Sequence, residues 1–225
     1  MDKVKAYIQL SELFKKNGYS LFLVGGTVRD ILLNIELTDM DVVTDATPIE
    51  MKKFIDGDYT FSSVGSVRYK IDDVKFDITT LRKEGRYIDH RHPNKITFVR
   101  DLKTDHKRRD FTINAMYMDS NFYLYDYENG EEDLNNKILK MVGNPIKRLK
   151  EDPLRIIRCL RFSLLYDLQI DRKLDKAIYK CLKYLKNINA EKIKMELKKI
   201  DNKYDERLIE LLDKYSINYF IDVLE

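Results

Sequence analysis

Cysteine is scarce in this chain: the only two, Cys159 and Cys181, both lie in apolar, helix-like patterns. We expect buried free thiols rather than a disulfide, and neither is a candidate nucleophile. Tryptophan is absent, and four prolines and eight glycines are too few for a collagen-like or low-complexity chain. With 225 residues, of which 44% are hydrophobic and 35% charged, the chain can bury a core in one large or two small domains.

Long apolar segments are also missing. No run approaches the roughly 18 residues that a membrane helix requires. Residues 1–16 carry acidic and polar side chains where a signal peptide would need an unbroken apolar centre. These features predict a cytoplasmic protein with no membrane partner. The three histidines, His90, His92 and His106, follow no metal-ligand spacing, and we interpret them as loop or surface residues.

Charge is distributed unevenly along the chain, although the net charge is only +3. Residues 1–139 carry a net charge of −3, residues 140–200 a net charge of +10, and residues 201–225 a net charge of −4. The basic block has two interpretations, a solvated helical surface or a surface that binds a polyanion. Charge alone favours neither interpretation.

The first half of the chain mixes helical and strand-like patterns. Short apolar or alternating segments predict strands at residues 21–24, 40–44, 59–64, 67–72 and 74–80, and a hairpin around Ser120-Asn121. Helices are expected over residues 4–14 and 27–33, from Pro48, where Thr47 and Glu50 complete a capping box, and from about Asp105.

The second half of the chain has a different pattern. Residues 82–94 have no consistent period and contain Gly85 and Pro93, so we predict a long mobile loop there. After residue 146 the apolar residues recur at intervals of three and four, which predicts only helices. The expected fold class is α+β, with a small mixed sheet in residues 1–140 and an all-helical domain in residues 141–225.

Asp39 and Asp41 are the most informative acidic pair. Residues i and i+2 of a strand project to the same face about 6 to 7 Å apart, so two carboxylates there could share divalent cations. Asp77 lies on the polar face of its predicted strand and is our candidate third carboxylate. Two Mg²⁺ ions held in this way could activate a 3′-hydroxyl and stabilise a leaving pyrophosphate. Turn capping or surface charge explains most isolated D-x-D pairs.

The string GGTVRD, residues 25–30, joins a predicted strand to a predicted helix. Gly25 and Gly26 would let the backbone approach an anion closely, and Arg29 could add a charged fork. A phosphate group could therefore bind at this turn. In the alternative interpretation the glycines only tighten the turn and Arg29 pairs with an aspartate. No G-K-[ST] string follows, so the turn is not a P-loop.

Six strings resemble, in this order and at these spacings, the class II tRNA nucleotidyltransferases and bacterial poly(A) polymerases. They span residues 21–200 and read LFLVGGTVRDILL, LTDMDVVTDATP, RRDFTINAM, DYENGEEDL, EDPLRIIRCLRF and NAEKIKMELKKI. The resemblance implies a polymerase-β-like catalytic head over residues 1–140 and a helical neck over residues 141–225, with or without the start of a body domain. It also implies template-independent addition of nucleotides to tRNA 3′ ends, with Asp39 and Asp41 as metal ligands and Asp77 as the third carboxylate.

Asp152 and Arg155 are candidates for base selection. They stand at i and i+3 of a predicted helix, so we expect them on one helix face. Cytosine and adenine both present an amino donor beside a ring-nitrogen acceptor, which a carboxylate and a guanidinium can bind together, whereas uracil and guanine present the opposite order. The pair could thus admit C and A, as CCA synthesis requires. A surface salt bridge is the alternative. The resemblance adds Arg158 and Arg161 of the same string as nucleotide-binding residues.

Within RRDFTINAM, the resemblance places the sugar and phosphates of the nucleotide near Arg109, Asp110 and Asn114, and helix capping by Asp110 is the alternative. Residues 84–93 are similar to the flexible loop that relatives need for switching from C to A addition, which argues against an enzyme that adds C only. Two departures look conservative: VGSV at residues 64–67 where relatives commonly show an H-G-T-V-like string, and Lys192 where an arginine is usual.

The sequence therefore predicts a tRNA nucleotidyltransferase that adds C and A to a tRNA 3′ end from CTP and ATP with two Mg²⁺ ions. An A-adding or CC-adding specialist and a poly(A) polymerase are alternatives within the same class. In another class, the chain would be an RNA-binding module with a lapsed active site. The intact set of Asp39, Asp41 and Asp77 argues against that module, because clustered carboxylates are costly to keep without a use.

Overall fold

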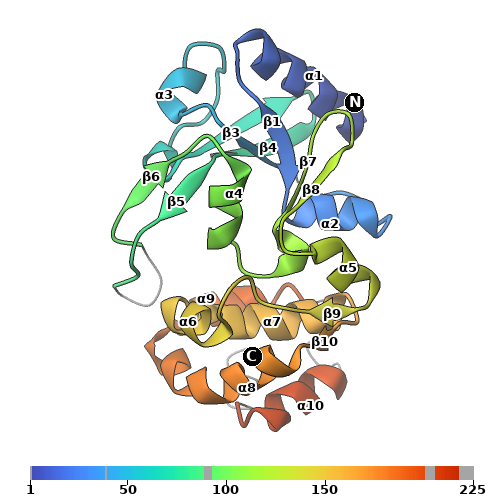
Figure 1. Ribbon diagram of the computed structural model, residues 1–225, viewed down its shortest axis with the longest axis vertical. Coiled ribbons are helices and arrows are strands. Elements are labelled where there is room, and N and C mark those ends of the chain that lie inside the picture. The colour runs from blue at the N-terminus through green and yellow to red at the C-terminus, as the bar shows by residue number, and fades with distance from the viewer. Residues whose placement is uncertain (1, 39, 89–92, 201–205, 218–225) are drawn as a thin grey trace. The chain divides into compact units, whose positions relative to one another are not determined.

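The computed structural model describes residues 2–38, 40–88, 93–200 and 206–217 (Figure 1). The chain divides into two compact units. Unit 1 comprises Met1–Gly85 and Lys95–Glu131, and unit 2 comprises Arg86–Asn94 and Glu132–Glu225. Among the described residues, no helix combines the length and the apolar character needed to cross a membrane.

A six-stranded mixed sheet forms the centre of unit 1. Its strand order is β3-β4-β2-β1-β7-β8. Strands β2 and β4 are parallel, and all other neighbours are antiparallel. The strands are β1 (Leu21–Val24), β2 (Met40–Thr44), β3 (Ser66–Ile71), β4 (Val74–Thr80), β7 (Met116–Met118) and β8 (Leu124–Asp126). The predicted α+β class with a mixed sheet is confirmed.

The sheet forms because its strands bury apolar side chains, at alternating positions in β4 and at most positions in β1, β2 and β7. In β4, Val74, Phe76 and Ile78 are buried, while the residues between them face the other side. Helix α1 (Lys3–Lys16) buries Tyr7, whose hydroxyl donates to the carbonyl groups of Leu21 and Met118, each at 3.1 Å. This contact fixes α1 to β1 and to the end of β7.

Three short helices of unit 1 begin or end near the predicted positions. Helix α2 (Gly26–Leu32) follows β1, and α3 (Pro48–Met51) starts with the predicted capping box of Thr47 and Glu50. A helix was predicted to begin at about Asp105, but helix α4 (Leu102–Asp105) ends there. It begins earlier because the side chain of Asp101 caps its N-terminus. The predicted strand at residues 59–64 is wrong: Ser62–Val64 forms a 3₁₀ turn.

The predicted loop at residues 82–94 is also partly wrong. Strand β5 (Arg82–Glu84) pairs with β6 (Ile96–Phe98), and Tyr87 forms a bridge with Pro93. Segments of three residues are too short to show a period in the sequence. His90 and His92 lie outside the described residues.

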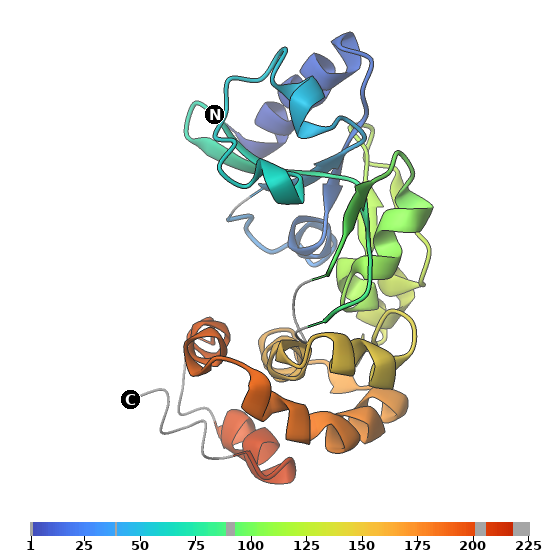
Figure 2. The ribbon, with the colours of Figure 1, turned by 90° about the vertical axis from the view of Figure 1, so that its left-hand side faces the viewer.

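Figure 2 shows the helices of unit 2 in yellow to red. Over residues 132–200 and 206–217 the unit contains one small sheet besides these helices, in which β9 (Ile138–Leu139) and β10 (Gln169–Ile170) pair in parallel. The all-helical prediction for residues 141–225 missed β10, and no strand was predicted at β9, because two-residue strands leave no pattern. Cys159 and Cys181 are buried free thiols, as expected. The helices are α5 (Gly130–Asn135), which crosses the boundary between the units, α6 (Pro145–Glu151), α7 (Leu154–Leu165), α8 (Arg172–Cys181), α9 (Ala190–Leu197) and α10 (Glu206–Lys214).

Candidate active site

Three charged residues form a row across adjacent strands of the sheet. Asp41 on β2 is directly opposite Asp77 on the parallel strand β4, and Asp77 is directly opposite Arg68 on β3. In-register neighbours project to the same face. Arg68 Nε lies 3.4 Å from Asp77 Oδ1, with side chains that are 60% and 48% exposed. The structure thus brings Asp41 and Asp77 together on an accessible face.

The donor set of this row fits a divalent cation. Carboxylate oxygens are the ligands that Mg²⁺ prefers, and it tolerates water for the remainder of its shell. Across residues 2–38, 40–88, 93–200 and 206–217, no three Asp, Glu, His or Cys side chains gather closely enough to hold a metal ion. Asp39, the other predicted ligand, immediately precedes β2 and lies outside the described residues.

The glycine turn lies beside Asp41. Gly25 has φ of 64° and ψ of −125°, a conformation that a side chain would strain. Thr27 Oγ1 accepts a hydrogen bond of 2.9 Å from the backbone N–H of Asp41. This bond joins the start of α2 to β2, so the turn and the carboxylate row form one continuous site.

Arg29 is buried and bound to protein groups. Its Nε and Nη2 donate to Asp30 Oδ1 at 3.0 and 2.8 Å, and its Nη1 donates to Asn114 Oδ1 at 2.7 Å. The pairing with an aspartate that the alternative interpretation required is therefore present. Asn114 Nδ2 in turn donates to Asp110 Oδ1 at 3.2 Å, and the same oxygen accepts from the N–H of Phe111. These bonds tie the GGTVRD turn to RRDFTINAM.

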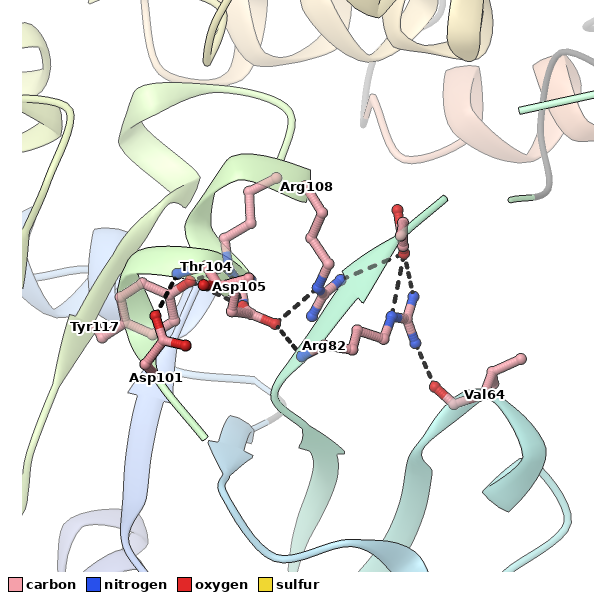
Figure 3. A network of polar contacts seen from close by, with 9 residues as sticks. Val64, Arg82, Asp101, Thr104, Asp105, Arg108 and Tyr117 are labelled. Carbon is pink, nitrogen blue, oxygen red and sulfur yellow. Dashed lines mark hydrogen bonds and ion pairs between the residues drawn. The ribbon is translucent and has the colours of Figure 1, made fainter. Parts of the chain in front are cut away.

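A buried aspartate that was not among the predicted site residues organises the arginines of RRDFTINAM. Figure 3 shows Asp105 among Arg82, Arg108 and Tyr117. Asp105 Oδ1 accepts from the Arg82 N–H at 2.9 Å and from Arg108 Nε at 2.8 Å. Its Oδ2 accepts from Arg109 Nε at 3.2 Å, from Arg109 Nη2 at 3.0 Å and from the Tyr117 hydroxyl at 2.8 Å. All five bonds converge on a carboxylate that is fully buried.

The charge of Asp105 is stabilised by its partners. Burial alone would raise the pKa of this carboxyl, but Arg109 and Arg108 outweigh burial and hold the pKa well below its usual range. Arg109 also reaches the glycine turn, since a Cβ atom on Gly25 would lie 3.7 Å from Arg109 Nη1. The signal available in the sequence was D-x-x-R-R, because residues three and four apart share a helix face.

Asp152 and Arg155 do not share the face of one helix, and that prediction is wrong. Helix α6 ends at Glu151, Asp152 has an extended conformation with φ of −145° and ψ of 95°, and α7 begins at Leu154. Pro153 explains the break, because a proline disfavours helical conformation in the residue before it. Asp152 Oδ1 accepts from the N–H of Leu154 at 3.1 Å, a local turn bond that leads into α7.

Two glutamates hold the arginines of EDPLRIIRCLRF. Buried Arg155 donates from Nη1 to the Arg148 carbonyl at 3.0 Å, and this nitrogen lies 3.7 Å from Glu151 Oε2. Glu196, which comes from α9, accepts from Arg161 at 2.5 Å and lies 3.7 Å from Arg158. Glu196, which belongs to the string NAEKIKMELKKI, thus fixes α9 to α7, a role that its sequence pattern did not predict.

Known proteins resemble most of the chain. A CCA-adding enzyme of Staphylococcus epidermidis is 40% identical over 196 residues, which are 85% of this chain and 49% of that protein. The crystal structure of the Bacillus stearothermophilus CCA-adding enzyme in complex with CTP matches with a TM-score of 0.87 and 30% identity, over 98% of this chain and 54% of that one. A tRNA nucleotidyltransferase complexed with a primer tRNA and an incoming ATP analog matches with a TM-score of 0.76 and 30% identity, over 94% of this chain and 62% of that one.

The chain spans about half the length of the curated relatives that it matches. The model of the poly A polymerase head domain matches residues 21–140, which include the glycine turn, the carboxylate row and RRDFTINAM. This match covers more than half of the chain and agrees with the predicted fold class. The chain therefore belongs to the poly A polymerase head domain family.

Proposed function

We propose that this chain carries the catalytic part of a CCA-adding tRNA nucleotidyltransferase. It would extend a tRNA 3′ end with C and A from CTP and ATP, with two Mg²⁺ ions held by Asp39, Asp41 and Asp77. The observation that carries the proposal is the register of β2 and β4, which places Asp41 opposite Asp77, beside a glycine turn hydrogen-bonded to β2. The names of the relatives support the choice of CCA addition.

The residues of unit 1 would divide the work as follows. The turn at Gly25 leaves room for phosphate groups, and Arg109 adds positive charge there. Bound divalent ions would polarise the attacking hydroxyl and neutralise the departing pyrophosphate. Asp41 and Asp77 would hold these ions, and Asp110 and Asn114 would contact the sugar. Arg29, buried against Asp30, would act by fixing Asn114 in place.

An addition assay tests this function. A tRNA lacking its CCA end is incubated with each nucleoside triphosphate alone and in pairs, and the products are sized. We expect C additions with CTP alone and a complete CCA end with CTP and ATP together. Only A addition, only C additions or a long A tail would instead identify an A-adding specialist, a CC-adding specialist or a poly(A) polymerase. RNA binding without any addition would indicate a module with a lapsed active site.

Base choice should depend on Asp152 and Arg155, with Arg158 and Arg161 supporting the nucleotide-binding surface. Asp152→Ala should slow the addition of C and A, because the variant lacks the partner of the amino group that cytosine and adenine share. The lost contact should be worth about 1 to 3 kcal/mol. Relative acceptance of UTP should rise, because Arg155 can still donate to a carbonyl oxygen. Single-turnover incorporation with all four nucleotides measures both effects.

A second variant separates base choice from the loss of a local hydrogen bond. Asp171→Ala removes a carboxylate that accepts from the first N–H groups of α8 in the same unit, and Asp152→Ala removes the one that accepts from the N–H of Leu154. Each change should cost about 1 kcal/mol of stability. Only Asp152→Ala should alter the order of nucleotide preference. An unchanged order would show that Asp152 does not read the base.

Residues 140–200 should bind the RNA backbone through their net charge of +10. If about five phosphates are contacted, log K should fall against log salt concentration with a slope of roughly −3.5 to −4.5, because each contact releases a condensed counterion. Fluorescence anisotropy of labelled tRNA at several salt concentrations measures this slope. A slope near zero would mean that these lysine and arginine side chains form only a solvated helical surface that does not bind RNA.

A further inference from the structure

The order of the strands gives the candidate active site a direction. The glycine turn follows β1, Asp41 lies on the neighbouring strand β2, Asp77 lies on β4, and Arg68 lies on the edge strand β3. The bond between Thr27 and Asp41 fixes the turn at the β2 end of the row. A line therefore runs from the glycine turn through two carboxylates to the β3 edge of the sheet.

This direction separates the two reactants. In phosphoryl transfer, the attacking oxygen and the leaving group lie roughly in line on opposite sides of the phosphorus. If the triphosphate lies at the glycine turn, as the proposed function requires, the attacking 3′-hydroxyl must approach from the side of β4 and β3. The end of the RNA should therefore lie over the β3 edge.

Two exposed side chains at that edge have the chemistry to bind a terminal nucleotide. The guanidinium carbon of Arg68 lies 5.1 Å from the centre of the Phe61 ring, and Phe61 is 48% exposed. Aromatic rings and guanidinium groups stack on unpaired bases, and arginine also pairs with phosphate. The ion pair of Arg68 with Asp77 is half-exposed, so exchanging it for a phosphate contact should cost little.

The segment that carries Phe61 is fixed to β3. The backbones of Asp58 and Arg68 exchange hydrogen bonds of 2.8 and 3.0 Å. Gly57 permits this close approach, since a Cβ atom there would lie 2.6 Å from the Arg68 carbonyl oxygen. Asp58 Oδ1 also accepts from the N–H and hydroxyl of Thr60, at 2.9 and 2.6 Å. The ring of Phe61 is thus held in place beside Arg68 before any ligand binds.

We propose that Phe61 and Arg68 form the subsite for the 3′-terminal nucleotide of the RNA. The ring stacks on the terminal base, and the guanidinium pairs with the phosphate next to it. The 3′-hydroxyl then lies over Asp77, on the opposite side of the reacting phosphorus from the glycine turn. The proposal rests on the proposed function for its direction, but the binding of an RNA end can be measured without catalysis.

A hairpin RNA with a single-stranded tail that ends in 2-aminopurine, whose fluorescence falls when it stacks, tests the subsite without added nucleotide. Binding to the wild-type chain should quench the fluorophore, and Phe61→Leu should remove most of this quenching. Arg68→Met should raise the dissociation constant three- to tenfold. It should also reduce the slope of log K against log salt by about 0.7 to 0.9, which corresponds to one phosphate.

Two exposed residues of unit 1 provide matched controls. Tyr123 is 64% exposed near β8, at the opposite edge of the sheet, and Lys70 is the next cation on the same face of β3, paired with Asp73. Tyr123→Leu should keep the quenching, and Lys70→Met should keep the salt slope. Quenching that persists in Phe61→Leu, or effects in the controls equal to those in the test variants, would overturn the proposal.

The addition assay distinguishes this proposal from the proposed function. If the wild-type chain adds no nucleotide, but quenching is seen with the wild-type chain and lost in Phe61→Leu, the proposed function is wrong and the subsite stands. If the wild-type chain adds C and A while Phe61→Leu keeps full quenching, the function stands and the subsite is wrong. Should Phe61→Leu fold poorly by thermal melting, the salt slope of Arg68→Met decides the outcome.

Discussion

Asp41→Ala should abolish nucleotide incorporation while the protein keeps its melting temperature. The side chain is exposed, so its removal opens no cavity in the core, and the bond from its backbone N–H to Thr27 remains. The loss should exceed about 10³-fold, because the carboxylate stabilises charge at the reacting phosphorus through a bound ion. Single-turnover incorporation in Mg²⁺, together with thermal melting, measures both parts. Asp39→Ala should lose incorporation to a similar extent.

The control for this prediction is another exposed carboxylate of the same sheet. Asp73 lies in the turn between β3 and β4, and its side chain is 97% exposed. Asp73→Ala removes the same charge from unit 1 and should retain incorporation within a factor of two or so, as surface substitutions usually do. Near-normal turnover by Asp41→Ala in Mg²⁺ would show that Asp41 is not a metal ligand.

Asp105→Asn should lower the free energy of unfolding by about 3 to 5 kcal/mol, a large part of the stability of a typical domain. The substitution keeps the shape of the side chain but removes the buried negative charge that both Arg108 and Arg109 contact. Urea unfolding at neutral pH measures the loss. Asp101→Asn is the matched control, because Asp101 caps the same helix and asparagine caps equally well. Its effect should stay within about 0.5 kcal/mol.

The effect of Asp105→Asn should also depend on pH. The pKa of Asp105 is lower in the folded protein than in an unfolded chain, where an aspartate has a pKa of about 3.9. The carboxylate therefore stabilises the fold fully above that value and progressively less as the pH falls toward the folded pKa. The difference in the free energy of unfolding between the wild-type chain and Asp105→Asn should shrink below about pH 4. A difference that stays constant down to pH 3 would show that charge is not the cause.

The sequence predicted those parts of the fold that local pattern determines. Strand β4 buries one set of alternating side chains, and the capping box of Thr47 and Glu50 involves residues three apart. The register that sets Asp41 opposite Asp77 depends on pairing between strands about 35 residues apart in sequence, which no local pattern encodes.

The errors in the site have similar causes. We expected a helix to begin near Asp105, but this residue ends α4 and accepts hydrogen bonds from four residues, one of them as distant in sequence as Arg82. The expected shared face of Asp152 and Arg155 failed because the restriction that Pro153 places on the preceding residue outweighed the helical spacing. In both cases a backbone constraint or a distant contact decided the structure.

The attachment of residues 57–61 to β3 also bears on how the protein behaves at high concentration. An open edge strand presents unpaired N–H and C=O groups to which a strand of another molecule can add, and this is a common route to aggregation. Here the backbone of Asp58 occupies the edge at Arg68, and Arg68 and Lys70 place positive charges along the same strand. The segment that presents Phe61 thereby also protects the sheet from self-association, so that changes at Gly57 would reduce solubility.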